Sequence, residues 1–371
     1  MRRSTLVFLL AFCLLFVWKF VSWRLIPEKP VRVVILDKTV PVDNYREHKG
    51  LVWVLNNLRY VNKDTGRPFE FEKDYYGFFP LPDKKYTIRP LPADLERPGL
   101  IYIADTYGVY TADFYKESIH GERSRLIYGG LQRSEVASIE RSLTGKNTLI
   151  AEFNSFASPS SKEARNRLEE LLAVKWTGWT ARRFEDLSLR NTEIPVWMPA
   201  NYQKQYGAPW AFEGAGFVFV NEDDRLFVLR DGPEIGPKRN RVIFTREAAD
   251  EYKVANDLEY VYWFDIVTVS QDRNAKTLAD YKLDVTPQGA KILAENGLTE
   301  EFPAIIRTDS PNHTYYFAGD FADYNESPRF YGAKAWRPHF LIRGVNPAAE
   351  FFWKVYFPFM DKVLSELYLR Q

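Results

Sequence analysis

The chain has 371 residues, which is long enough for one large domain or two ordinary domains with a well-buried core. Its 50 basic residues nearly balance its 49 acidic residues, and four of the basic ones lie within the first 24 positions, so the rest of the chain is slightly acidic. This balance excludes the basic footprint of a nucleic-acid-binding protein, and the 46% hydrophobic content excludes a disordered chain.

The chain begins with an apolar segment, residues 5–23, whose only charged residue is Lys19. As a helix it would span about 28 Å, close to the thickness of the hydrocarbon core of a bilayer. Arg2 and Arg3 precede it and favour a cytoplasmic N-terminus. A cleaved signal peptide is the alternative, but no small-x-small cleavage site follows. We therefore predict a single-pass membrane protein, anchored in the bilayer through residues 5–23, with the bulk of the chain extracytoplasmic.

Strands and helices alternate in the next part of the chain. Continuous apolar runs predict buried parallel strands, and apolar residues at helical spacing predict the helices between them. The predicted strands are residues 31–36, 100–104, 126–128 and 148–151, and the predicted helices are residues 45–58, 131–143 and 162–174. Ser160 and Glu163 stand at capping-box spacing before the last helix, and residues 62–99 read mainly as loop. Short connections between alternating elements predict a parallel sheet.

An antiparallel β extension is predicted to follow. Its hairpin comprises residues 217–220 and 226–229 around a charged turn, and residues 242–244 and 258–269 add further strands. Residues 286–296 read as a helix, and residues 315–318 as a last strand of the core sheet. We therefore expect an α/β fold, with a flavodoxin-like, mostly parallel sheet and an antiparallel β extension, preceded by one N-terminal transmembrane helix.

The C-terminal residues form an amphipathic helix that Asn346 caps and that Pro358 should kink. We favour docking of this helix on the domain core, with an interfacial or partner-binding helix as the alternative. The predicted organisation has four parts: a membrane anchor (1–26), an α/β domain (27–205), an antiparallel β extension that returns to the core sheet (206–343) and a C-terminal helix (344–371).

Residues 126–176 read as a strand, a Gly-Gly turn, a helix closed by Gly145, a strand and a sharp elbow, Glu152-Phe153-Asn154-Ser155. This pattern resembles the middle of the class I glutamine amidotransferase-like superfamily, including its trehalose-utilisation-like branch. The resemblance implies a flavodoxin-like fold. Catalytic members carry a cysteine at the elbow, and the single cysteine here is Cys13, so the resemblance implies that thiol amidotransfer is lost.

Predicted strands repeatedly end in a carboxylate. In a parallel sheet such ends form one edge, where ligands bind, so two of these groups can converge as an acid and an ionised partner for glycoside cleavage. The catalytic candidates are Asp105, Glu152, Asp265 and Asp320. The ligand-binding candidates are Tyr107, Tyr110, Asn154, Ser155 and Asp323. The alternative is that each strand-end carboxylate only caps the next turn.

Three functions follow from these observations. The first is a domain that binds an envelope or exported glycan, or a membrane partner, and the second is a carboxylate-dependent glycan hydrolase. The third is a structural subunit of a membrane complex. We assign no cofactor, no metal and no nucleic-acid partner, and we leave a metal between Asp320 and Asp323 open as an alternative. The aromatic segments 75–86 and 197–210 are expected to be ligand-facing loops.

Overall fold

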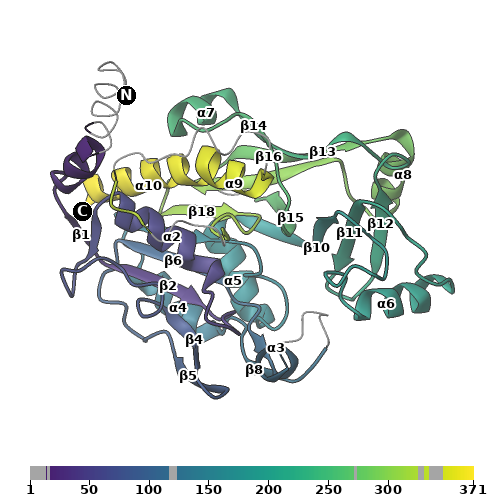
Figure 1. The fold of residues 1–371 in the computed structure, drawn as a ribbon, viewed down its shortest axis with the longest axis horizontal. Helices are drawn as coiled ribbons and strands as arrows, with labels where there is room; N and C mark the ends of the chain where they lie inside the picture. Colours follow the sequence, from purple (N-terminus) through teal and green to yellow (C-terminus); the bar gives the residue numbers. More distant parts are fainter. Residues whose placement is uncertain (1–13, 15–16, 117–122, 271–273, 325–329, 334–345) are drawn as a thin grey trace, which may run out of the picture.

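The computed structural model describes residues 14, 17–116, 123–270, 274–324, 330–333 and 346–371. Its main element is a mixed sheet of ten strands, in the order β14-β13-β16-β17-β18-β9-β6-β2-β4-β5 (Figure 1). A second sheet of four antiparallel strands, β12-β11-β10-β15, lies beside it. The fold is therefore α/β, with a parallel core and an antiparallel extension, as the sequence predicts.

The parallel core consists of β18 (His313–Phe317), β9 (Thr148–Ala151), β6 (Leu100–Asp105), β2 (Val33–Asp37) and β4 (Tyr76–Leu81). Every residue of β6 and β9 is buried, which explains why both strands read as continuous apolar runs. The C-terminal ends of β2, β6, β9 and β18 together form one edge of the sheet, which we call the carboxyl edge.

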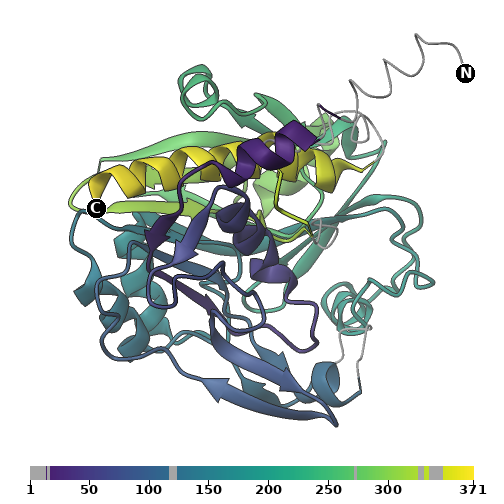
Figure 2. The same ribbon diagram turned by 60° about the vertical axis from the view of Figure 1, so that its left-hand side comes forward.

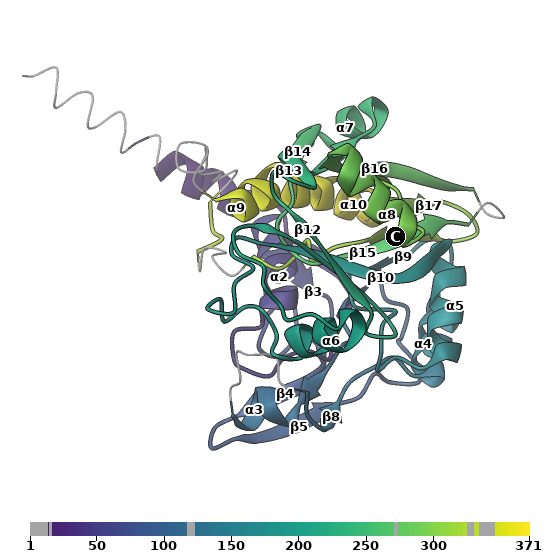
Figure 3. The same cartoon turned by 90° about the vertical axis from the view of Figure 1, so that its right-hand side faces the viewer.

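Helices cover both faces of this core (Figure 3). On one face lie α2 (Arg46–Asn57) and α10 (Phe357–Arg370), and on the other lie α4 (Arg133–Ser142) and α5 (Lys162–Leu172). Ser161, one residue after the expected Ser160, caps α5 by accepting a hydrogen bond from the backbone of Ala164.

The extension of the large sheet is antiparallel throughout. It contains β17 (Glu301–Thr308), β16 (Ala275–Val285), β13 (Ile235–Phe244) and β14 (Asp257–Glu259). The second sheet contains β10 (Val174–Phe184), β11 (Gly216–Asn221), β12 (Leu226–Arg230) and β15 (Phe264–Val269), and β11 and β12 form the predicted hairpin. Helices α7 (Arg246–Tyr252) and α8 (Pro287–Glu295) flank these strands.

Two local predictions are wrong, and a third is incomplete. Residues 62–99 lie mainly outside strands and helices, as predicted, but β4 and β5 (Lys85–Arg89) form a hairpin among them; Gly77 and Pro80 interrupt its apolar pattern in the sequence. The strand β8 (Leu126–Tyr128) pairs with β7 (Val109–Tyr110), just before α3 (Thr111–Tyr115), and stays outside the core sheet. Residues 197–210 contain a helix, α6 (Trp197–Tyr206), which packs on β12.

The C-terminal segment is one long helical element with a π-helical middle. It consists of α9 (Pro347–Phe351), η1 (Phe352–Tyr356) and α10, and Asn346 caps it as predicted. Pro358 has no N–H to donate to the carbonyl of Lys354, and that carbonyl instead accepts a hydrogen bond from the backbone of Ala255, 3.0 Å away. The proline therefore frees the group that ties this helix to the segment between α7 and β14.

Most of the predicted membrane anchor, residues 5–23, lies outside the described residues. Among the described residues, no helix is both long enough and apolar enough to cross a membrane. Residues 17–24 are helical, and Figure 2 shows this purple segment beside the yellow C-terminal helix. Trp23 attaches it to the body, because its indole N–H donates to the carbonyl of Asn57 at 2.7 Å.

Helix α2 packs so closely on the segment after β18 that it has room only for glycine at position 50. A Cβ atom there would lie 2.3 Å from the carbonyl oxygen of Ala322 and 2.9 Å from a ring carbon of Phe352. A methyl group at Gly50 would therefore push α2 away from the carboxyl edge.

We expect Gly50→Ala to lower the free energy of unfolding by about 1–3 kcal/mol, the usual cost of overpacking, as measured by urea denaturation of the full chain. Lys49→Ala, on the same helix, is the control and should change it by less than about 1 kcal/mol. Equal stability of Gly50→Ala and the wild type would show that α2 does not pack this closely.

Candidate functional site

The parallel strands bring their terminal carboxylates to one edge of the sheet. Asp37 and Asp105 are the last residues of β2 and β6, Glu152 directly follows β9, and Asp320 lies three residues after β18. All four are at least nine-tenths buried. These groups differ in how their oxygens are engaged, and that difference separates structural carboxylates from those available for a ligand.

Asp265 joins this edge from the second sheet. The backbone N–H of Asp265 donates to the carbonyl of Ala318 at 2.9 Å, which places β15 against the end of β18. The hydroxyl of Tyr316 donates to Asp265 Oδ2 at 2.6 Å, and Oδ1 of this buried carboxyl has no hydrogen-bond partner among the described residues. The antiparallel strand thus supplies a carboxyl group to the edge that the parallel strands form.

Asn154 connects Asp265 to Asp105. It stands at the elbow after β9 in the left-handed backbone region, with φ of 63°, a conformation that asparagine tolerates better than most residues. Its side-chain amide donates to Asp105 Oδ2 at 3.1 Å, and its backbone N–H is near enough to Asp265 to lower the pKa of that carboxyl group. One residue of the elbow therefore stands next to two carboxyl groups from different sheets.

Both of these carboxyl groups titrate near neutrality. Burial raises the pKa of Asp105 to about 7, the charge of Asp37 adds to the rise, and hydrogen bonds from Thr39, Tyr107 and Asn154 limit it. Burial likewise raises the pKa of Asp265 to about 7, against the hydrogen bond from Tyr316. At neutral pH each carboxyl is therefore close to half ionised, so the pair can both give and accept a proton.

Glu152 has a structural role, although we counted it among the catalytic candidates. The hydroxyl of Tyr102 donates to its Oε1, and the backbone N–H of Ala322 donates to its Oε2 at 3.3 Å. With only 1% of its surface exposed, Glu152 is occupied in holding the segment after β18.

A second cluster of carboxylates lies near this pair, and the sequence analysis identified only two of its three members. Glu47, Asp320 and Asp323, which we call the acidic triad, each place one carboxylate oxygen within 4.8 Å of the others. Burial raises the pKa of Asp320 well above its usual value, and the charges of Glu47 and Asp323 raise it further. Arg46 is the neighbouring cation, with Nε 2.6 Å from Glu47 Oε1 and 3.8 Å from Asp323 Oδ2.

Glu47, Arg46 and His48 were not among the predicted site residues. The signal that points to them is position, because they open the helix that follows the strand-end carboxylate Asp37, and helix starts at this edge face the ligand crevice.

His48 is packed inside the protein: its Nδ1 lies 2.6 Å from Asp37 Oδ2 and its Nε2 lies 2.8 Å from the carbonyl of Phe71. Asp37 is therefore engaged within the protein.

Tyr107 and Tyr110 form an aromatic pair at the rim of the site. Their ring centroids are 4.9 Å apart, Tyr107 is 43% exposed, and its backbone N–H donates to Asp105 Oδ1 at 2.6 Å. Ser155 is not at the rim, because it is fully buried and its hydroxyl donates to the carbonyl of Glu152 at 2.7 Å. Of the two elbow candidates, only Asn154 reaches the carboxyl groups.

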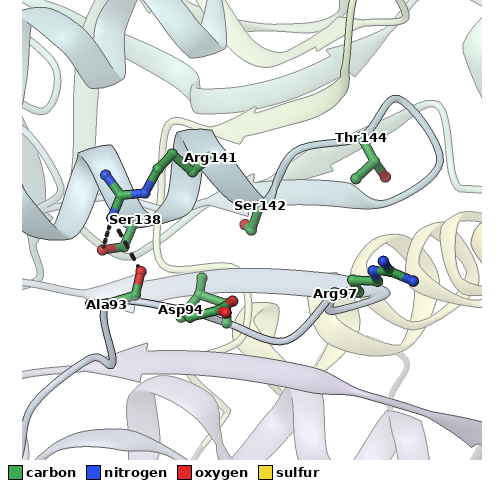
Figure 4. A pocket seen from close by; sticks show the side chains of 8 residues that line it. Ala93, Asp94, Arg97, Ser138, Arg141, Ser142 and Thr144 are labelled. Atoms are coloured by element: carbon green, nitrogen blue, oxygen red, sulfur yellow. Dashed lines mark hydrogen bonds between the residues drawn. The ribbon is translucent and has the colours of Figure 1, made fainter.

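A pocket of about 390 Å³ lies elsewhere (Figure 4). It is formed by the loop before β6 and the C-terminal half of α4, where Arg141 donates to the carbonyl of Ala93 and to the hydroxyl of Ser138, both at 3.1 Å. This pocket is at the N-terminal ends of the strands, opposite the carboxyl edge, and it contains none of the candidate residues.

No known family model matches the chain, and no curated protein matches it. Among solved structures, the chain is similar to a β-galactosidase from Bacillus circulans, with 10% identity and a TM-score of 0.37, over 79% of this chain and 30% of that one. It is also similar to a ThuA-like protein from Bacteroides uniformis, with 9% identity and a TM-score of 0.38, over 80% of this chain and 84% of that one. These similarities are structural and distant, and the chain spans about a third of the length of the β-galactosidase.

The raised pKa values of Asp105 and Asp265 predict that stability falls as pH rises. Each carboxyl stays protonated in the folded protein up to about pH 7, whereas it ionises near pH 4 in the unfolded chain. Their contribution is therefore complete below about pH 4 and is lost as pH rises to about 7. We expect the midpoint of urea unfolding to decrease between about pH 5 and pH 7.5, with a smaller decrease in Asp265→Asn.

Asp309→Asn is the control for this measurement. Burial acts to raise the pKa of Asp309, but the hydrogen bonds and charges of Arg307 and His313 together outweigh it and lower the pKa, so this group titrates below the chosen range. The control should keep the wild-type slope. An unfolding midpoint that rises with pH, or an unchanged slope in Asp265→Asn, would contradict the assignment.

Proposed function

We propose that this protein is a membrane-anchored, outward-facing, amidotransferase-like domain that binds an envelope or exported glycan at the carboxyl edge. The observation that carries the proposal is that Asn154 stands next to both Asp105 and Asp265, and that Tyr107, whose ring is exposed, donates its backbone N–H to Asp105. Carboxylates accept hydrogen bonds from sugar hydroxyls, and an exposed tyrosine ring offers an apolar face on which a sugar can lie. The elbow carries no thiol, so amidotransfer chemistry is not part of the proposal.

The membrane anchor in this proposal rests on the sequence of residues 5–23. Four large apolar side chains at the end of this segment or just after it are more than two-fifths exposed, as expected of a helix that continues into a lipid phase. They are Val17, Trp18, Val21 and Leu25.

A carboxylate-dependent glycan hydrolase is the second candidate, and the pKa values near 7 of Asp105 and Asp265 favour it. Glycoside cleavage uses one protonated and one ionised carboxyl group, and two carboxyl groups with pKa values near 7 offer both forms at neutral pH. Asp105 or Asp265 would donate the proton to the leaving oxygen, and the other would remain ionised.

A structural subunit that uses the C-terminal helix to hold a partner is less well supported. Phe352, Trp353, Phe359 and Met360 are all buried against the body of the protein, so the apolar stripes of this helix are already covered. Partner binding through those stripes would require the helix to leave the core.

We expect the full chain, purified in detergent, to bind at least one member of a panel of envelope and exported polysaccharides in affinity electrophoresis. Tyr107→Ala should weaken this binding about tenfold, because it removes the exposed ring. Tyr206→Ala is the matched control, since Tyr206 is 48% exposed but lies on α6, and it should bind normally. If no polysaccharide is retained, the glycan proposal fails.

The same incubations separate the two candidate functions when reducing ends are measured. A hydrolase would release reducing ends, and Asp105→Asn and Asp265→Asn would each reduce the rate by about 10²-fold or more while the protein stays folded. Binding without release would favour a binding domain.

We expect the full chain to remain in the membrane pellet after extraction with alkaline carbonate, and a variant that lacks residues 2–16 to appear in the supernatant. Protease added outside intact cells should digest a C-terminal tag. Extraction of the full chain by carbonate would refute the anchor, and a protected tag would refute the outward orientation.

A further inference from the structure

The acidic triad is unusual because two of its three members each have a buried carboxylate oxygen without a hydrogen-bond partner among the described residues. Glu47 lies in the first turn of α2, whereas Asp320 and Asp323 lie in the segment after β18. Their residues are only 4%, 7% and 5% exposed. Among the described residues, Oδ1 of Asp320 and Oδ1 of Asp323 are buried without any hydrogen-bond partner. Buried oxygens in native proteins are nearly always bonded, so two such atoms in one acidic cluster indicate a missing ligand.

The charge around the triad also indicates a cation. Arg46 forms its close ion pair with Glu47 and stands 3.8 Å from Asp323 Oδ2, and its side chain is 47% exposed. No ion pair with Asp320 is found among the described residues, and Asp37 and Asp105 add negative charge nearby. The charge of Arg182 also reaches Asp323, but this arginine forms its ion pair with Glu193. Arg46 is therefore the arginine that pairs with the triad, and it faces three buried carboxyl groups.

The size and chemistry of the triad select the class of cation. The three oxygens lie within 4.8 Å of one another, which is about twice the Ca²⁺–oxygen distance of ~2.4 Å, so one ion can contact all three. All three groups are carboxylates, the ligands of hard cations, whereas zinc and copper sites are built mainly from histidine and cysteine. We propose that Glu47, Asp320 and Asp323 form a binding site for a hard divalent cation, with Ca²⁺ preferred to Mg²⁺.

The surrounding structure holds the triad in place before any ion binds. Gly50 brings α2 to the carbonyl of Ala322, and Glu152 accepts a hydrogen bond from the backbone N–H of Ala322. Gly319 is required next to Asp320, because a Cβ atom there would lie 2.4 Å from two tyrosine hydroxyls. A bound ion would therefore link α2 to the segment after β18, and this proposal stands whether or not the protein binds a glycan.

The test uses the full chain in detergent after removal of metals with EDTA, with CaCl₂ and MgCl₂ as separate probes. We expect Ca²⁺ to raise the melting temperature by about 2 °C or more and to give a calorimetric binding signal. Asp320→Asn and Asp323→Asn should each weaken Ca²⁺ binding by roughly 10²-fold. Loss of a residue that only supports a metal ligand costs about 10- to 100-fold, and these residues are proposed to contact the ion directly, so we expect the upper end of that range. Asp265→Asn is the matched control, because Asp265 also has an unpaired buried oxygen but lies outside the triad, and it should bind Ca²⁺ normally.

The melting temperatures of the wild type and a variant, each measured with and without Ca²⁺, distinguish a cation site from a cluster of carboxyl groups that binds no cation. Without metal, Asp320→Asn should melt above the wild type, because it removes a carboxyl group whose ionisation is unfavourable at this buried place; with Ca²⁺ this order should reverse. If Asp320→Asn does not fold, Glu47→Gln replaces it in the same comparison. The proposal is overturned if neither Ca²⁺ nor Mg²⁺ binds the wild type, if only zinc binds, or if the variants bind Ca²⁺ as tightly as the wild type does.

Discussion

The site depends on parallel strand pairing more than on any single contact. Because β2, β6, β9 and β18 run in the same direction, four segments of the chain emerge at one edge of the sheet. The carboxylates that follow these strands are then forced together in a buried space, where their mutual repulsion and loss of hydration must be offset by hydrogen bonds, protons or a cation. The same arrangement of strands therefore gives the site its reactive carboxyl groups and lowers the stability of the fold, because those groups are buried close together.

Much of the fold could be predicted because its central strands have a simple signature. A strand that is buried on both faces must be apolar at every position, as β6 and β9 are, and such runs are visible without any structure. The β4–β5 hairpin was missed for the opposite reason: all five residues of β5 are exposed, so no apolar periodicity marks it. The predictability of a strand here follows from how completely the rest of the protein covers it.

The site could be predicted only where neighbours in the sequence determine it. Strand-end carboxylates are visible in the sequence, but Glu47 is not conspicuous there, since its meeting with Asp320 depends on where β18 enters the sheet. Glu152 shows the converse limit. Its residue type and position suited catalysis, yet the hydrogen bonds that occupy it come from Tyr102 and from the backbone after β18, which no local pattern reveals.

The place of β18 has a consequence for how the chain is made. This strand lies between β9 and β17 and is the link between the parallel core and the antiparallel extension, yet among the described residues it is the last strand in the sequence. While the protein emerges from the ribosome, one side of β9 remains an open strand edge until residue 313 is available, and open apolar edges recruit other chains. The growing polypeptide therefore exposes this edge until most of its length has been made.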